Sequence, residues 1–294
     1  MGPAVAKQFR TVAIIGLGLI GSSIARAMGA SDPGVHLKAY DFASEVRQQA
    51  RRLNVVHQVT ESADDAVSGA DLVILCVPVR AMEAVAQSLS RSIGKDAIVT
   101  DVGSSKSLVS SVLRRILPGA RIVPGHPVAG SERSGPEAGS AELFEGRWCI
   151  LTPDRHTDPD DVEAIASFWR SLGAKVEIMS AQQHDLVLAA ISHVPHLLAS
   201  SSVAAVAALE EKHGQPFLEF SAGGFHDFTR IAAANASVWK DIFLSNKEAI
   251  VQVCSLFRNM AERLEQLITD EDEATLLQEL EQARQVRLNL NVNS

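Results

Sequence analysis

The sequence predicts an α/β protein in which an N-terminal Rossmann-type doubly wound sheet is followed by an all-α C-terminal domain. Strand-like apolar runs alternate with helical patterns over about the first 180 residues, and this alternation is typical of a doubly wound sheet. Beyond about Ala181 helical spacing dominates and no strand-like run follows. The length of 294 residues also fits two domains. We therefore expect one domain over residues 1–180 and a second over residues 181–294.

The expected strands are short and rich in Val and Ile. Four of them are nearly continuous apolar runs, which are typical of parallel strands buried on both faces. Helical patterns such as SEVRQQARRL and DVEAIASFWRSLG fall between the strands. The expected strands cover residues 11–18, 36–41, 71–78, 97–103, 121–127, 148–153 and 174–179.

The second domain is expected to be helical throughout. Pro195 should start or kink a helix within residues 184–209, because proline lacks the N–H donor that a helix interior uses. The glycine-containing residues 221–235 connect to another helix, and residues 271–290 carry leucines at helical spacing among charges.

Composition and charge narrow the range of partners and locations. The formal net charge is −8 and the sequence has no Lys- or Arg-rich run, which argues against a nucleic-acid partner. The N-terminus lacks a signal-peptide pattern and no apolar run approaches the ~20 residues of a membrane span, so a cytoplasmic protein without a membrane partner is expected. Three widely spaced cysteines, Cys76, Cys149 and Cys254, fit free thiols in that reducing compartment.

The segment VAIIGLGLIGSSIARAM carries Gly16, Gly18 and Gly21 in the pattern GxGxxG between a strand and a helix. The first glycine allows a tight turn, the second lets the backbone approach a pyrophosphate, and the third lets helix and strand pack closely. Asp41 lies twenty residues after Gly21, at the end of the next expected strand. This is the context that the motif requires, so a dinucleotide site is expected.

NAD is the expected dinucleotide. A carboxylate at Asp41 can accept hydrogen bonds from the ribose hydroxyls but repels the 2′-phosphate of NADP, and the residues FASE that follow it contain no arginine. The expected cofactor-binding residues come from the glycine loop, from the strand end at Asp41 and from the end of the strand over 71–78. They are Gly16, Gly18, Leu19, Ile20, Gly21, Asp41, Val77 and Pro78.

Two further strand ends carry side chains suited to proton transfer. Ser104 and Ser105 follow the strand over 97–103, where a serine can either cap a helix or place its hydroxyl beside the nicotinamide. His126, in RIVPGHPVAGSERSG, ends the next strand and should face the same crevice. A neutral imidazole can take a hydroxyl proton while hydride leaves the same carbon, although a histidine in such a loop can also serve only to bond the backbone.

The motifs GLGLIGSS, DVGSSK, GHPVAGSERSG, SHVPH and GGFHDFTRIA occur in this order and spacing over roughly residues 10–270. Together they resemble the prephenate/arogenate (cyclohexadienyl) dehydrogenase family of tyrosine biosynthesis. The resemblance implies NAD-dependent oxidative decarboxylation of prephenate to 4-hydroxyphenylpyruvate, of arogenate to tyrosine, or of both, by a homodimer that forms through the helical dimerisation domain. It also implies that His126 is the catalytic hydrogen acceptor and that Ser104 helps to position the substrate hydroxyl and the histidine.

The same resemblance implies a substrate pocket. Arg230 is its expected anchor for a carboxylate, because a guanidinium can donate two parallel hydrogen bonds. His193 and His196 lie three residues apart, but no third ligand is convincingly placed and the family needs no metal, so none is expected. The expected pocket residues are Ser104, His126, Glu132, His196, Gly223, His226, Asp227, Arg230 and Trp239.

His226 is where the substrate side chain is expected to be distinguished. Relatives commonly have Lys or Arg between GGF and DFTR, whereas a histidine is mostly neutral at pH 7. Loss of a fixed cation weakens the attraction for the keto acid of prephenate, and Asp227 can attract the ammonium of arogenate or cap the next helix. We therefore expect both substrates to be accepted, with a preference for arogenate.

Two alternatives remain open on the sequence. A β-hydroxyacid dehydrogenase also joins a dinucleotide domain to a helical one, and it would need a catalytic lysine, for which Lys240 and Lys247 are the candidates. A non-catalytic NAD-binding sensor would bind the dinucleotide without turnover. Formation of NADH with prephenate or arogenate separates these three functions.

Overall fold

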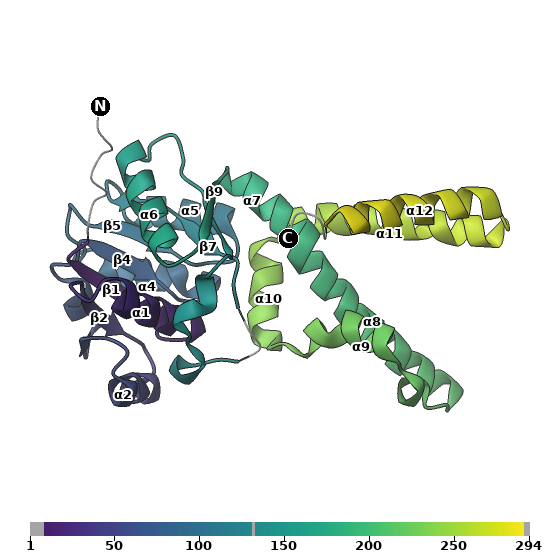
Figure 1. Cartoon of the computed structure of the whole chain (residues 1–294), viewed down its shortest axis with the longest axis horizontal. Helices are drawn as coiled ribbons and strands as arrows, with labels where there is room; N and C mark the ends of the chain where they lie inside the picture. The colour runs from purple at the N-terminus through teal and green to yellow at the C-terminus, as the bar shows by residue number, and fades with distance from the viewer. Residues whose placement is uncertain (1–8, 131–132, 291–294) are drawn as a thin grey trace. The chain divides into compact units, whose positions relative to one another are not determined.

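The computed structural model describes residues 9–130 and 133–290, and its N-terminal part is built on a six-stranded sheet (Figure 1). The strands are β1 Thr11–Ile15, β2 His36–Tyr40, β3 Gln58–Val59, β4 Leu72–Leu75, β5 Ile98–Asp101 and β6 Arg121–Ile122. Their order is β3-β2-β1-β4-β5-β6 and every neighbouring pair is parallel, so the predicted doubly wound sheet is confirmed. The strand β3 was not expected, because two residues leave no apolar pattern.

A second, three-stranded sheet lies beside the first. It consists of β7 Gly125–Pro127, β8 Trp148–Leu151 and β9 Lys175–Ile178. The β7 and β8 strands are antiparallel, and β8 and β9 are parallel. The single strand predicted over 121–127 is therefore wrong, since its two ends enter different sheets. Pro124 has no N–H to continue the ladder with β5, and its carbonyl instead accepts from the Thr152 N–H at 2.9 Å.

Helices cover both faces of the six-stranded sheet (Figure 1). The helices of this part are α1 Leu19–Ser31, α2 Ser44–Leu53, α3 Ala63–Val67, α4 Met82–Leu89, α5 Lys106–Ile116 and α6 Pro159–Ser171. Ile14 of β1 belongs to one apolar cluster with Ile24 of α1, whereas the adjacent Ile15 belongs to another with Met82 of α4. Neighbouring residues of one strand thus pack on opposite faces, as the continuous apolar strands predict.

A long helical stretch begins at Ala181. It consists of α7 Ala181–Leu188, one π-helical turn Ala189–His193, and α8 Val194–His213. Pro195 lies in the first turn of α8, directly after the π-helical turn, so the predicted start or kink of a helix at this proline takes the form of an irregular turn inside one continuous helical stretch. Beyond α8 the chain forms α9 Gly223–Thr229 and α10 Ala236–Ser245, with short 3₁₀ turns at Phe217–Phe220 and Arg230–Ala233.

The stretch Ala181–His213 has the length and composition of a membrane-spanning helix, with a mean hydropathy of 1.5 over its most apolar 18 residues. This differs from the expectation that no apolar run approaches that length, because the helix continues through the serines and histidines that interrupt the apolar run. A helix packed inside a protein can have the same composition. His184, Asp185, His193 and His196 lie on this helix and are buried, which fits a packed helix.

The internal contacts of the chain divide it into residues 1–247 and 248–294. The second unit is a helical hairpin of α11 Lys247–Thr269 and α12 Glu273–Leu290, whose two helices lie side by side (Figure 1). Glu271 adopts a positive φ of 53° in the turn between them, and Arg263 Nε donates to Glu279 Oε1 at 2.8 Å across the pair. The helix predicted within 271–290 is confirmed.

Candidate active site

The glycine loop between β1 and α1 has the geometry that its motif predicts. Gly16 has φ +100°, and a Cβ there would lie 2.2 Å from the Cys76 carbonyl oxygen. A Cβ on Gly21 would lie 1.9 Å from the Gly16 carbonyl oxygen, so both positions exclude any larger residue. Gly18, which N-caps α1, has no atom within 4 Å of the place of its Cβ. That open space before a helix N-terminus fits the pyrophosphate of NAD.

The expected ribose-binding carboxylate is fixed by the backbone at the end of β2. Asp41 Oδ2 accepts from the Leu17 N–H at 2.8 Å, and its Oδ1 accepts from the Ala43 N–H at 2.9 Å. Arg47, which the sequence analysis did not consider, folds back from α2 to this turn. Its Nη1 donates to the Asp41 carbonyl at 2.8 Å and to the Phe42 carbonyl at 3.1 Å. The guanidinium therefore braces the turn that carries Asp41.

The other expected cofactor residues border the same loop. Leu19 and Ile20 form the first turn of α1 and are half-buried. Val77 follows β4, and a Cβ on Gly16 would lie 3.3 Å from its Cγ1, so Val77 contacts the glycine loop. Pro78 beside it is exposed. These positions leave the crevice at the carboxyl ends of β1 and β4 lined by apolar side chains, which suits the flat rings of a dinucleotide.

A cavity of about 690 Å³ lies where the chain after β5 and the strand β7 meet the helical residues. Ser104 and His126 line it from the first part of the chain, and Ser192, His193 and Trp239 line it from the helices. Ser140 also lines the cavity, and its N–H donates to Ser23 Oγ of α1 at 3.1 Å, so the cavity borders the helix that starts at the glycine loop. His126 and Ser104, which were expected to face one crevice, thus line the same cavity.

The two readings of the serine pair are separated by the structure. Ser105, not Ser104, is the N-cap residue of α5, and its side chain makes no capping hydrogen bond. Ser104 precedes the cap and lines the cavity. Its hydroxyl is therefore available to a ligand rather than engaged at the helix start.

His126 is oriented by a second histidine that the sequence analysis missed. His126 Nδ1 lies 2.8 Å from His184 Nε2, and His184 Nδ1 lies 2.9 Å from Asp185 Oδ1. All three side chains are buried. The adjacent residues His184 and Asp185 lie on α7, whereas His126 lies on β7, so only the tertiary fold brings them together.

A buried ion pair contacts the backbone of β7. Lys106 and Asp101 form a salt bridge in which both side chains are fully buried. Lys106 Nζ also donates to the Gly125 carbonyl at 2.8 Å, and Asp101 Oδ2 accepts from the Gly103 N–H at 2.7 Å. Lys106, the last residue of the motif DVGSSK, therefore fixes the backbone beside His126. The sequence did not indicate this role, because a lysine in the first turn of a helix is ordinarily a solvent-exposed residue.

The electrostatic surroundings keep the histidines of the cavity neutral. Burial lowers the pKa of His126 well below its usual 6.5, and the positive charges that His184, Lys106 and His193 can carry lower it further. Burial also lowers the pKa of His184, and it lowers the pKa of His193 to about 4. His126 is thus a neutral imidazole at pH 7, which is the form a general base needs.

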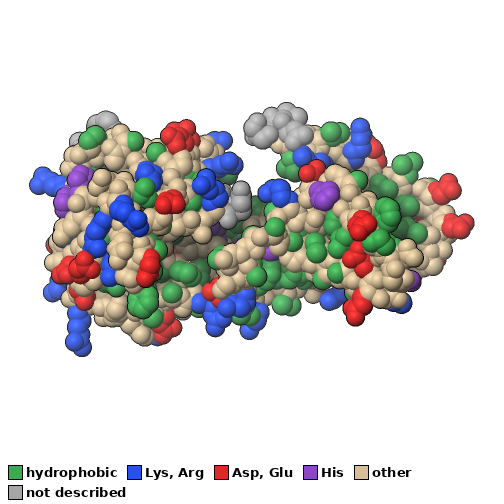
Figure 2. Space-filling model, turned by 90° about the horizontal axis from the view of Figure 1, so that it is seen from below, with side chains coloured by type: hydrophobic (Ala, Val, Ile, Leu, Met, Phe, Trp, Pro, Cys, Tyr) green, Lys and Arg blue, Asp and Glu red, His purple; other side chains and the backbone are tan. Residues whose placement is uncertain are grey.

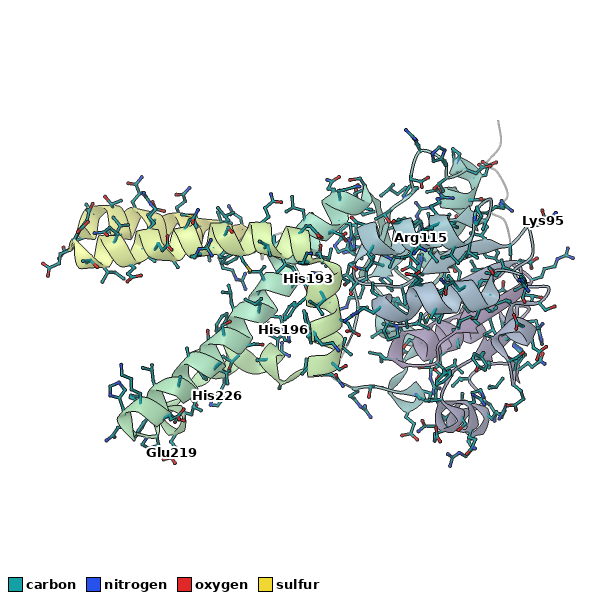
Figure 3. The ribbon with its side chains drawn as sticks, turned by 180° about the vertical axis from the view of Figure 1, so that it is seen from behind. Lys95, Arg115, His193, His196, Glu219 and His226 are labelled. Carbon is teal, nitrogen blue, oxygen red and sulfur yellow. The ribbon has the colours of Figure 1, made fainter. Side chains whose placement is uncertain are left out.

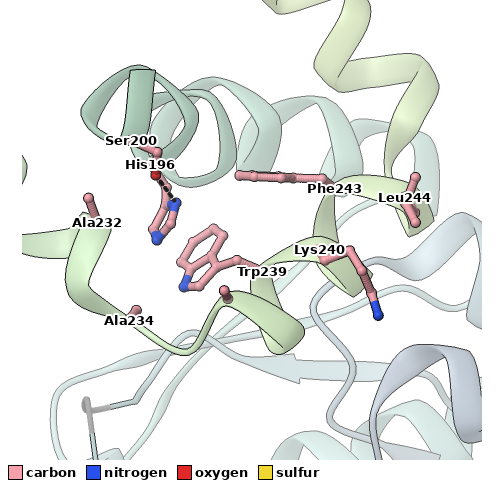
Figure 4. A pocket seen from close by; sticks show the side chains of 9 residues that line it. His196, Ser200, Ala232, Ala234, Trp239, Lys240, Phe243 and Leu244 are labelled. Carbon is pink, nitrogen blue, oxygen red and sulfur yellow. Dashed lines mark hydrogen bonds between the residues drawn. The ribbon is translucent and has the colours of Figure 1, made fainter. Parts of the chain in front are cut away.

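His196 lies in a neighbouring pocket of about 340 Å³ (Figure 4). Its ring stacks on Trp239 with 3.6 Å between ring centroids, and Ser200 Oγ lies 3.5 Å from its Nδ1. Trp239 lines both this pocket and the larger cavity, so it separates His196 from His193. Figure 3 labels both histidines along the long helical stretch.

The expected substrate segment does not reach the cavity within one chain. Gly223, His226, Asp227 and Arg230 are exposed on α9 and the turn after it. His226 Nε2 lies 3.1 Å from Ser221 Oγ, and Figure 3 shows His226 away from His193, nearer to Glu219. Glu132 lies outside the described residues. Among the described residues, Arg147 is the only Arg or Lys that lines the cavity, against Glu142 and Glu145.

No metal centre is built by the described residues. Within residues 9–130 and 133–290, no group of three or more His, Cys, Asp or Glu side chains is arranged to hold a metal ion. The spacing of His193 and His196 is explained by their separate contacts. His193 Nδ1 lies 3.1 Å from Asn246 Nδ2, whereas His196 stacks on Trp239.

Known proteins resemble the chain over nearly its whole length. Residues 24–178 match the family description "Prephenate dehydrogenase, nucleotide-binding domain" and residues 180–282 match "Prephenate dehydrogenase, dimerization domain". A cyclohexadienyl dehydrogenase of Zymomonas mobilis is 44% identical over 285 residues, which is 97% of each chain. A prephenate dehydrogenase of Bacillus subtilis is 34% identical over 94% of this chain and 75% of its own. The solved structure of prephenate dehydrogenase from A. aeolicus with hydroxyphenyl propionate and NAD+ has a TM-score of 0.89 at 34% identity, covering 97% of this chain and 100% of that one.

Proposed function

Because the chain belongs to the prephenate dehydrogenase family and is an NAD-dependent dehydrogenase, we propose that it acts on both arogenate and prephenate, with a preference for arogenate. The reaction of the family is an oxidative decarboxylation in tyrosine biosynthesis. The observation that carries the assignment to this chain's residues is the neutral His126 in a cavity that it shares with Ser104 and that borders α1, the helix after the glycine loop.

His126 is the general base of the proposed reaction. Its ring takes the proton of the substrate's ring hydroxyl while the hydrogen on the same carbon leaves as hydride. NAD, bound at the glycine loop, supplies the acceptor for that hydride. The ring carbon–carboxylate bond then breaks, CO₂ leaves, and the electron pair of that bond makes the ring aromatic. The proton held by His126 can return to the phenolate oxygen, so the base ends neutral.

Ser104 is the second polar group of this step. Its hydroxyl lines the same cavity as the His126 ring and is not used as a helix cap. It can donate to the substrate oxygen as that oxygen becomes a carbonyl. Such a donor stabilises the transition state more than the alcohol, because negative charge develops on the oxygen as its proton leaves.

The preference for arogenate rests on charge. Among the described residues, the cavity is lined by one Arg or Lys, Arg147, and by two carboxylates, Glu142 and Glu145. This balance favours the side chain of arogenate, which carries an ammonium, over the purely anionic keto acid of prephenate. His226 supplies no fixed cation at the position where relatives commonly have one.

The functional unit is proposed to be a homodimer. Large apolar side chains remain exposed on the helices of a single chain, and Figure 2 shows such side chains gathered over the helical part. Exposed apolar surface of this extent marks an interaction site. Arg230 lies on an exposed turn, from which it can reach the cavity of a neighbouring chain and bind a carboxylate that both substrates carry. The exposed apolar side chains include Leu209, Phe217, Phe220 and Phe228 in one unit and Leu256, Phe257, Met260 and Ile268 in the hairpin.

The domain division and the location follow from the same assignment. Ser180 N-caps α7 through its side chain, which accepts from the Gln183 N–H, and we place the boundary there, between residues 1–180 and 181–294. A biosynthetic dehydrogenase that draws on the NAD pool is proposed to be cytoplasmic.

The alternative of a lysine-dependent β-hydroxyacid dehydrogenase gains no support, since Lys240 lines the smaller pocket and its Nζ lies 3.4 Å from Asp241 Oδ1.

The proposal is tested by turnover. The purified protein is mixed with NAD and either arogenate or prephenate, NADH formation is followed, and the product is identified by mass spectrometry. We expect tyrosine from arogenate and 4-hydroxyphenylpyruvate from prephenate, with the larger kcat/KM for arogenate. NAD binding without turnover of either compound would favour the sensor, and oxidation of a β-hydroxyacid instead would favour the lysine-dependent alternative.

A further inference from the structure

We propose that His184 and Asp185 are positioning residues for the base, and that the Asp185 carboxylate fixes the tautomer of both histidines so that the lone pair of His126 lies on Nε2. The inference rests on the proposed role of His126. It assigns a function to two adjacent residues at the start of the helical part that carry no recognisable motif.

The end of this hydrogen-bonded chain is an ionised carboxylate. Asp185 Oδ1 accepts from the Lys106 N–H at 2.7 Å, and its Oδ2 accepts from the Ser107 N–H at 2.8 Å, so both oxygens meet the first turn of α5. Burial alone would raise the pKa of Asp185, but the hydrogen bonds from His184, Ser107 and Lys106 lower it below its usual value. An ionised carboxylate has no proton to donate, so every partner of Asp185 must be a donor.

The same requirement determines which ring nitrogen of His184 and of His126 carries the hydrogen. His184 Nδ1, 2.9 Å from Asp185 Oδ1, must carry its hydrogen, and the Nε2 of neutral His184 is then an acceptor. His126 Nδ1, 2.8 Å from that Nε2, must in turn be the N–H of its ring. Neutral His126 therefore keeps its lone pair on Nε2. This is the nitrogen left to accept the substrate proton.

The same chain stabilises the charge that the reaction creates. When His126 takes the proton it becomes an imidazolium, and the groups facing it are His184, Lys106 and His193, with Asp101 and Asp185 behind them. The charge of Asp101 is already neutralised by its salt bridge with Lys106. Asp185 is therefore the anion available to the imidazolium, through the polarised ring of His184.

The hydrogen-bonded residues Asp185, His184 and His126 are held in place by several elements of the fold. Asn246 Nδ2 donates to the Asp185 carbonyl at 2.8 Å, which fixes the backbone of α7 at this residue. The side chain of Asp185 joins α7 to the start of α5, and His184 joins α7 to β7. The base is thereby oriented by the helical part of the chain, so its alignment depends on how that part packs on the nucleotide-binding part.

A pair of substitutions separates orientation from packing. In His184→Gln the amide oxygen can accept from His126 Nδ1 while the amide N–H₂ donates to Asp185, which preserves the direction of both hydrogen bonds. In His184→Phe the ring volume is kept and both hydrogen bonds are lost. We expect His184→Phe to lower kcat by roughly 10² or more, within the range that general acid–base catalysis contributes, with unchanged KM for NAD. We expect His184→Gln to recover most of that loss.

The tautomers are read directly by NMR of protein labelled with ¹⁵N in its histidines. At pH 7 His126 and His184 should both show a protonated Nδ1 and an unprotonated Nε2, with assignments from His126→Asn and His184→Gln. The proposal is overturned if His126 carries its hydrogen on Nε2, or if folded His184→Phe turns over like the wild type. A wild type that oxidises neither arogenate nor prephenate would instead remove the proposed function, while the NMR result would stand on its own.

Discussion

Replacement of Lys106 by methionine should cost several kcal/mol of stability, because it leaves a buried charge without its partner. The side chains of Lys106 and Asp101 are both 0% exposed. In Lys106→Met the Asp101 carboxylate keeps the Gly103 N–H at 2.7 Å, but it loses the only cation that contacts it among the described residues. Breaking a buried ion pair by removing one partner costs about 3–5 kcal/mol.

The measurement is urea unfolding followed by circular dichroism, with the free energy of unfolding taken from the midpoint and slope. Arg170→Met is the matched control, because Arg170 pairs with Glu163 on the surface of α6 with side chains 51% and 65% exposed. Exposed pairs contribute about 0–1 kcal/mol, so this variant should differ little from the wild type.

A second substitution identifies the cause. Adding Asp101→Asn to Lys106→Met removes the unpaired charge while its amide oxygen can still accept from the Gly103 N–H, so part of the lost stability should return. A loss below about 1 kcal/mol in Lys106→Met, or a double variant less stable than the single one, would refute the reasoning from buried charge. The Gly125 carbonyl also loses its donor, so turnover should fall with stability.

Three further predictions concern the site. Because the pKa of His126 is lowered below 6.5 and its neutral form is the base, kcat/KM should stay level from pH 8 down to 6.5 and fall only in more acidic buffer; half-loss already above pH 6.5 would contradict this. Gly21→Ala should abolish NAD binding or folding, because its Cβ would lie 1.9 Å from the Gly16 carbonyl oxygen. Gly29→Ala on the same helix is the control, since its Cβ meets open space and the variant should bind NAD like the wild type. Calorimetric titration with NAD compares the two variants. His226→Lys should shift the ratio of kcat/KM values toward prephenate by about tenfold, the worth of one charge contact of roughly 1.4 kcal/mol, and an unmoved ratio would remove His226 as the discriminator.

The nucleotide-binding half could be predicted because its information is local. A strand, a glycine loop and a helix follow one another in the sequence, and the spacing from Gly21 to Asp41 is set by one β–α–β unit. The steric contacts of Gly16 and Gly21 in the structure are those that the motif implies. The break of the strand over 121–127 was also indicated locally, because Pro124 has no N–H for the strand ladder. The prediction used only the apolar pattern and did not take this proline into account.

The support of the base could not be predicted because its information is distant. His184 lies 58 residues from His126, and Asp185 lies 79 residues from Lys106, whose N–H donates to its carboxylate. The pair occurs at the start of a helix whose polar residues looked no different from solvent-facing ones. Arg47 was missed for a related reason, since only the fold of α2 returns its guanidinium to the turn at Asp41.

The pocket segment marks a different limit. The motif GGFHDFTRIA predicted substrate contacts for Gly223, His226, Asp227 and Arg230, but a single chain leaves these residues exposed. A motif indicates that a segment takes part in a function, but it does not indicate whether the segment contributes to the active site of its own chain or of a second copy. The proposed dimer is therefore needed before these residues can be placed around the substrate.

The central claim is that His126 is the base of an NAD-dependent oxidation, and His126→Asn tests it most directly. Asparagine is polar and can keep a hydrogen bond to His184 but cannot accept the substrate proton. NADH formation with arogenate and with prephenate is measured for both proteins, together with NAD binding by calorimetry. The account predicts that kcat falls by roughly 10²–10⁴ while NAD affinity is unchanged. Turnover of His126→Asn close to that of the wild type would contradict it.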